Sequence, residues 1–100
     1  MLWAIFRVNK PDSAAGREAA HQAHRNFLAS QKKILVLAGA QLSDDGKEVI
    51  GSLHVVNVNT RAEAQAFIDG DPFTQSGVFG SIRITRMRKG QWNPDAAEGA

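Results

Sequence analysis

The sequence predicts a small α+β domain whose strands and helices alternate in the order βαββαβ. Three observations support this prediction. An apolar strand opens the chain, two segments with helical periodicity flank a pair of strands joined by a tight turn, and a last strand follows the second helix. With 100 residues, of which 43% are hydrophobic, the chain has the size and composition of one globular domain.

The first strand is expected at residues 2–9. Alternate residues from Leu2 to Val8 form one apolar face, and Trp3 and Ile5 make the start of the other face apolar too. A polar segment at 10–13, which includes Pro11, ends this strand.

Asp12 or Ser13 can cap the helix that follows, which is expected to continue to about residue 31. His24 is expected at the edge of its core-facing stripe. The predicted stripe consists of Ala19, Ala20, Ala23 and Phe27.

The next two strands are expected at 34–42 and 49–57, joined by the turn Ser43-Asp44-Asp45-Gly46. The first of them is apolar on both faces, which is typical of a central strand. Gly39 within it indicates a bulge or a close approach of another backbone. The second is rich in β-branched residues.

A second helix begins at Thr60, where Thr60 and Glu63 form a capping box. This helix must end before Pro72, which cannot donate a backbone hydrogen bond. Asp71 is then the predicted N-cap of a single further turn. The last strand is expected at 78–87, so residues 1–90 form the domain and residues 91–100 form a C-terminal tail.

Connected by right-handed crossovers, these elements give a four-stranded antiparallel sheet with two helices on one face, the ferredoxin-like arrangement. The helix-free face is expected to carry Trp3, Ile5 and residues of the strand at 34–42. Such a face is too apolar to remain in water, so a second copy of the chain is expected to cover it. The chain is therefore predicted to be a homodimer, and further assembly is left open.

Composition argues against several classes of function. The net charge of +2 is too small to indicate a nucleic-acid binder. RNA-recognition motifs share this order of elements, but they carry stacking aromatics on the third strand, and residues 49–56 contain none. Cysteine is absent, which excludes a thiolate nucleophile and a Cys-type zinc site. Arg7 interrupts the apolar N-terminus too early for a signal peptide or a membrane span, so a cytoplasmic protein is expected.

His24 and Asp71 are the candidate catalytic pair, because a histidine beside a carboxylate is held in one tautomer and can transfer a proton near neutral pH. Spacing alone is equally consistent with structural roles: His24 as a helix residue at the core boundary, and Asp71 as a simple N-cap. A zinc site made of His21, His24 and His54 is conceivable, but His54 is better explained as a strand histidine with a hydrogen-bonded ring. No metal is expected.

Four segments of the chain together resemble the YCII-related (YciI-like) family of small dimeric α+β barrel proteins. They are Lys10-Pro11-Asp12-Ser13, His21-Gln22-Ala23-His24, Leu37-Ala38-Gly39-Ala40 and Gly70-Asp71-Pro72-Phe73. The resemblance covers residues 1 to about 87 and implies a ferredoxin-like homodimer. Most of the family has no assigned reaction, although a few relatives are linked to the breakdown of chlorinated aromatics, and similar barrels include muconolactone isomerases.

The resemblance also implies that the histidine of the family's His-Asp pair is His24 and that its aspartate is Asp71. Two positions differ from the common pattern. His21 stands where many relatives have arginine, which makes any contact with an anion weaker and dependent on pH. Ala40 follows Gly39 where many relatives have proline.

The leading hypothesis is an enzyme that acts on a small organic molecule, without a cofactor, by isomerisation or elimination. His24 would transfer the proton and Asp71 would orient it. The residues expected to bind the substrate are Arg17 and His21, which would attract an anionic group, and Gly39 and Phe73, which would line the pocket. The alternative is a non-catalytic module that binds a small ligand or serves as a dimeric partner of another protein.

Overall fold

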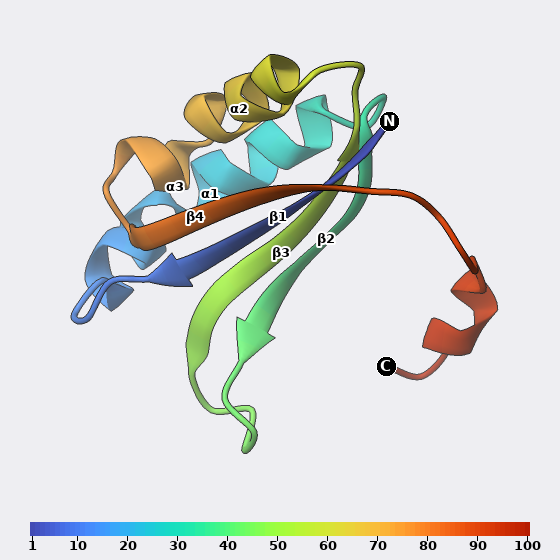
Figure 1. Cartoon of the computed structure of the whole chain (residues 1–100). Coiled ribbons are helices and arrows are strands. Elements are labelled where there is room, and N and C mark those ends of the chain that lie inside the picture. Colours follow the sequence, from blue (N-terminus) through green and yellow to red (C-terminus); the bar gives the residue numbers. More distant parts are fainter.

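The computed structural model describes all 100 residues and contains the expected order of strands and helices. The elements are β1 (Leu2–Asn9), α1 (Ala14–Ser30), β2 (Leu35–Leu42), β3 (Val49–Asn57), α2 (Arg61–Gly70), α3 (Pro72–Gln75), β4 (Phe79–Met87) and the short 3-10 helix η1 (Pro94–Ala97). The strands form one antiparallel sheet in the order β2-β3-β1-β4. The helices α1, α2 and α3 all cover the same face of this sheet (Figure 1). The predicted ferredoxin-like fold is confirmed.

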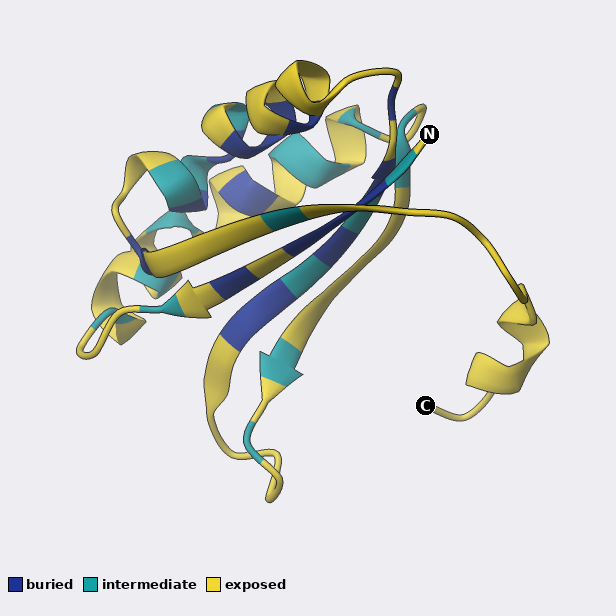
Figure 2. Cartoon of the chain, in the orientation of Figure 1, coloured by how far each residue is buried: buried dark blue, intermediate teal, exposed yellow.

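The core lies between the helices and the two central strands, β1 and β3 (Figure 2). Its largest cluster joins Trp3 and Ile5 of β1 to Phe67 and Ile68 of α2. The expectation that Trp3 and Ile5 lie on the helix-free face was therefore wrong. Both faces of β1 start apolar, so the alternation of residues could not decide which face the helices cover.

The helix-free face carries a different set of apolar side chains. Phe6 and Val8 lie on the face of β1 opposite to Trp3 and Ile5, and the strand register places Leu37 and Met87 on this same face. These four side chains are between 40% and 52% exposed. The face is thus apolar, as expected, although its residues differ from those predicted.

Strand β2 is an edge strand, and the expectation of a central strand was wrong. It pairs only with β3, and most of its residues are exposed. Its register shifts lie at Leu35/Leu37 and at Gln41/Leu42, on either side of Gly39. A Cβ atom added to Gly39 would meet no other atom within 4 Å, so no close backbone approach explains this glycine.

The buried side of α1 is rotated relative to the predicted stripe. His24 is the one buried residue of this helix, and Ala20 and Leu28, one turn away on either side, are half-buried. Ala19 and Ala23 are exposed. Small alanines do not mark a core face as large apolar side chains do, which is why the sequence placed His24 at the edge of the stripe.

The N-caps of α2 and α3 form at the residues that the sequence predicts. Thr60 accepts a hydrogen bond from the N–H of Glu63 and starts α2. Asp71 accepts one from the N–H of Phe73 and starts α3, with Pro72 at its first position. Beyond β4 the chain runs away from the sheet, and residues 88–100 are exposed (Figures 1 and 2). None of the helices is long and apolar enough to cross a membrane.

Candidate active site

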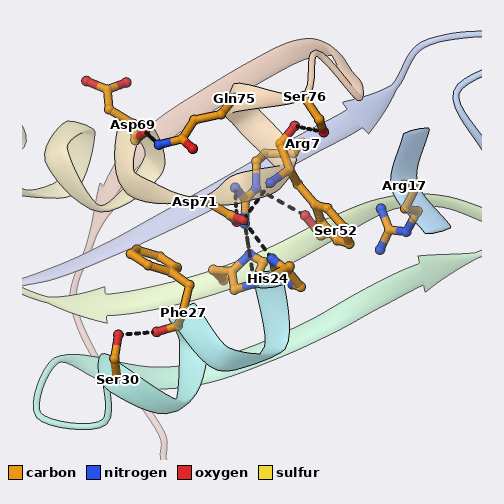
Figure 3. Close-up of polar contacts among 12 residues, drawn as sticks. Arg7, Arg17, His24, Phe27, Ser30, Ser52, Asp69, Asp71, Gln75 and Ser76 are labelled. Carbon is orange, nitrogen blue, oxygen red and sulfur yellow. Dashed lines mark hydrogen bonds and ion pairs between the residues drawn. The ribbon is translucent and has the colours of Figure 1, made fainter. Parts of the chain in front are cut away.

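The carboxylate of Asp71, at the junction of α2 and α3, is the centre of the site and is entirely buried. Its Oδ1 accepts hydrogen bonds from Nδ1 of His24 at 2.7 Å and from the N–H of Phe73 at 2.9 Å. Its Oδ2 accepts one from Nη1 of Arg7 at 2.8 Å. Figure 3 shows the side chains of Arg7, from β1, and His24, from α1, pointing toward Asp71.

These contacts keep Asp71 ionised. Burial by itself raises the pKa of this carboxyl, but the hydrogen bonds from His24 and from the N–H of Phe73, together with the charge of Arg7, outweigh burial and lower the pKa below its usual value. At neutral pH the carboxylate is therefore an acceptor only, and the proton it shares with His24 lies on the imidazole.

His24 is held in one orientation by two contacts. Its Nδ1 donates to Asp71, and its ring stacks on Phe73 with centroids 3.8 Å apart and planes 10° from parallel. The second ring nitrogen, Nε2, makes no hydrogen bond within the chain, and it is not enclosed by protein atoms. A neutral His24 thus presents the lone pair of Nε2 to the space beside it.

Arg7 was not identified as a site residue from the sequence. Its side chain is completely buried, and its Cζ lies 4.6 Å from the centre of the Phe79 ring. One signal was available, because Arg7 lies two residues after Ile5 and so shares its face of β1. An arginine on a covered face needs a buried partner, and Asp71 supplies it.

His54 of β3 was also left out of the site. Its ring is hydrogen-bonded, as expected, with Nδ1 2.7 Å from Nη2 of Arg7. Its ring centroid lies 6.0 Å from that of His24, so His54 does lie beside the helix. Burial, followed by the charge of Arg7, lowers the pKa of His54 to about 3, so this ring is neutral at physiological pH.

A cavity of about 270 Å³ lies between α1 and the strands β2 and β3. The lining residues are Arg17, His21, His24, Arg25, Leu28, Ala38, Gly39, Ala40, Ser52, His54 and Phe73. Five of the six predicted site residues are among them, whereas Asp71 lies behind His24 and does not reach the cavity.

The cavity wall formed by α1 is basic. Arg17, His21 and Arg25 are spaced four residues apart on this helix, and no acidic residue lines the cavity. Arg17 lies over Phe73, with Cζ 4.6 Å from the ring centre, and donates a hydrogen bond to Asn9. Such a surface favours an anionic ligand. No three histidine, aspartate or glutamate side chains are grouped in a way that could hold a metal ion.

Comparison with known proteins identifies similar chains. The model of the YCII-related domain matches residues 1–88. The protein YciI of Escherichia coli is 27% identical over 96 residues, which cover 89% of this chain and 98% of YciI.

Two solved structures are also similar. One is the 5-chloro-2-hydroxyhydroquinone dehydrochlorinase TftG from Burkholderia phenoliruptrix, solved in complex with 2,5-dihydroxybenzoquinone. It superposes with a TM-score of 0.82 and is 29% identical, over 90% of this chain and 96% of its own. A protein from Agrobacterium tumefaciens shares the fold, with a TM-score of 0.55 at 15% identity over 94% of this chain and 98% of its own.

Proposed function

Because the chain belongs to the YCII-related family, we propose that it is a cofactor-independent enzyme that transfers a proton on a small anionic molecule bound beside His24. The observation that carries this proposal is the arrangement of His24. One ring nitrogen is fixed by a buried, ionised carboxylate, and the other is free beside a cavity. This is the arrangement that a general base requires.

The chemistry follows from the contacts of the pair. Nε2 of His24 removes a proton from the ligand, and the imidazolium that forms is stabilised by Asp71. Asp71 does not take up this proton itself, because the hydrogen bonds from His24 and from the N–H of Phe73, together with the charge of Arg7, keep its pKa low. Return of the proton to another carbon is an isomerisation, and departure of a leaving group is an elimination. Neither reaction needs a redox cofactor.

The substrate class is suggested by the cavity and by one relative. Arg17 and His21 attract the anionic group, while Phe73 and the backbone at Gly39 line the space. A volume of about 270 Å³ suits a molecule with a single ring. TftG removes chloride from a hydroxylated ring, and we extend this to an oxygenated, acidic ring as the substrate of the present chain.

The experiment uses two compounds. Wild-type protein is incubated with 5-chloro-2-hydroxyhydroquinone, and chloride release is followed; separately, deuterium exchange into the ring of 2,5-dihydroxybenzoquinone is followed by NMR. His24→Gln is expected to slow either process by about 10²–10⁴-fold, the range for loss of a general base. The control is Gln22→Ala, on the exposed side of α1. Equal rates for wild type and His24→Gln would reject the assignment. Binding without exchange or chloride release would favour a non-catalytic module.

A homodimer is part of this proposal. The helix-free face exposes Phe6, Val8, Leu37 and Met87, and a second copy facing it would remove these side chains from water. An isologous contact between two such sheets is the simplest way to cover the face. We propose that this dimer acts in the cytoplasm on a small molecule and has no nucleic-acid or membrane partner.

A further inference from the structure

Two buried polar side chains in the cavity wall have no role in the proton transfer described above. Ser52 and His54 lie two residues apart on β3 and therefore on the same face of the sheet. They are 2% and 1% exposed, and both line the cavity.

Arg7 determines how both side chains are hydrogen-bonded. A guanidinium group has five N–H donors and no acceptor, so each of its partners must accept. Oγ of Ser52 accepts from Nε of Arg7 at 3.2 Å, and Nδ1 of His54 accepts from Nη2 at 2.7 Å. Neither Ser52 nor His54 can use its own hydrogen in these contacts.

Each partner is left with one hydrogen to donate. A serine hydroxyl has its O–H, and a neutral imidazole that accepts at Nδ1 has its N–H at Nε2. Nε2 of His54 lies 3.4 Å from the same Nη2 of Arg7, which is also a donor. Neither hydrogen meets an acceptor within the chain, and leaving a buried donor unpaired is unfavourable.

We infer that the O–H of Ser52 and the N–H of His54 form an oxyanion cradle, a pair of donors that binds the oxygen on which the substrate's negative charge develops. This inference rests on the proposed function of the cavity and narrows its substrate class. Arg7 positions both donors and polarises them with its charge. Since the pKa of His54 is low, the ring stays neutral and keeps Nδ1 as the acceptor for Arg7.

The distances allow one molecule to contact the base and the cradle together. The rings of His24 and His54 have centroids 6.0 Å apart. A carbonyl oxygen held by the cradle would place a neighbouring C–H near Nε2 of His24. The C–H bond breaks and its proton goes to Nε2; its electron pair forms a C=C bond to the carbonyl carbon, and the C=O π pair moves onto the oxygen, where the two donors stabilise the enolate. The substrate class is thus a ring compound with an acidic C–H next to a carbonyl group.

The test uses 4-nitrophenol, whose yellow phenolate form reports its ionisation by absorbance. The wild-type protein is expected to bind the phenolate and to favour it over the neutral phenol. Ser52→Ala and His54→Asn should each weaken phenolate binding about tenfold, the effect of one hydrogen bond of about 1.4 kcal/mol. His54→Asn retains a group at the position of Nδ1 for Arg7 but has no donor at Nε2, whereas His54→Gln reaches that position and should restore most of the affinity. Gln22→Ala, on the exposed side of α1 and outside the cavity, is the control.

A second measurement needs no variant that could fail to fold. Nitrogen-15 NMR of the wild-type histidines should show His54 with its proton on Nε2, and this proton should move downfield when the phenolate binds. Three results would overturn the cradle. They are a His54 proton on Nδ1, no phenolate binding by the wild type, and the same phenolate affinity for the wild type, Ser52→Ala and His54→Asn. His24→Gln should still bind the phenolate, so failure of His24 as a base would leave this result unchanged.

Discussion

Replacing Asp71 by asparagine should strongly destabilise the protein, because this carboxylate neutralises a buried arginine. The side chain of Asp71 accepts three hydrogen bonds, from His24, from Phe73 and from Arg7, and has no exposure to solvent. Asparagine has nearly the same shape but carries an N–H group in place of one oxygen. If its Oδ1 keeps the contacts with His24 and Phe73, its amide N–H faces Nη1 of Arg7, and two donors oppose each other.

The magnitude follows from the burial of both partners. The side chains of Arg7 and Asp71 are each 0% exposed. Breaking a buried ion pair by removing one partner costs about 3–5 kcal/mol, since the remaining charge is left uncompensated. A domain of this size has a free energy of unfolding of about 5–15 kcal/mol. With a slope of about 1.5 kcal/mol per molar urea, the unfolding midpoint should fall by about 2–3 M.

Urea unfolding followed by circular dichroism, at one fixed protein concentration, measures this change. Asp69→Asn is the matched control, because Asp69 lies near the end of α2, two residues before Asp71, and is exposed; its effect should stay within about 0.5 kcal/mol. The double variant Arg7→Met with Asp71→Asn should recover part of the loss, since the uncompensated charge is gone. A loss below about 1 kcal/mol for Asp71→Asn would refute the reasoning.

Three further predictions test the site and the proposed dimer. In the unfolded chain His54 binds a proton below about pH 6.5, whereas in the folded protein it stays neutral down to about pH 3. The free energy of unfolding should therefore fall by roughly 1 kcal/mol per pH unit as the pH drops between these values. Urea midpoints measured against pH should show a smaller slope for His54→Asn than for the wild type, and identical slopes would contradict the assignment. Phe6→Asp should shift the sedimentation coefficient from dimer to monomer, while Ala19→Asp, exposed on α1, should not; a monomeric wild type would contradict the dimer. Arg17→Ala should raise KM for an anionic substrate by about tenfold and leave kcat nearly unchanged, and a fall in kcat alone would show that Arg17 does not act by binding.

The sequence by itself determined the order of the elements and the positions of the caps. These are local properties: Thr60 and Glu63 lie within one turn of each other, and Pro72 ends α2 whatever surrounds it. The same local rules place Asp71 at the junction between α2 and α3. They indicated His24 only as a candidate partner, since nothing local connects two residues that are 47 positions apart.

Only the tertiary structure decided which face of β1 is covered, and with it the rest of the site. Trp3 and Ile5 could belong to either face, because a period of two shows which residues share a face and does not show where the helices lie. Once they are under the helices, Arg7 is buried with them and requires a counter-charge, which comes from Asp71, 64 positions away. Arg7 then donates hydrogen bonds to Ser52 and His54 and so fixes these two side chains in the cavity wall. A buried charge is satisfied by whatever the fold places beside it, so its partners could not be found from the neighbouring sequence.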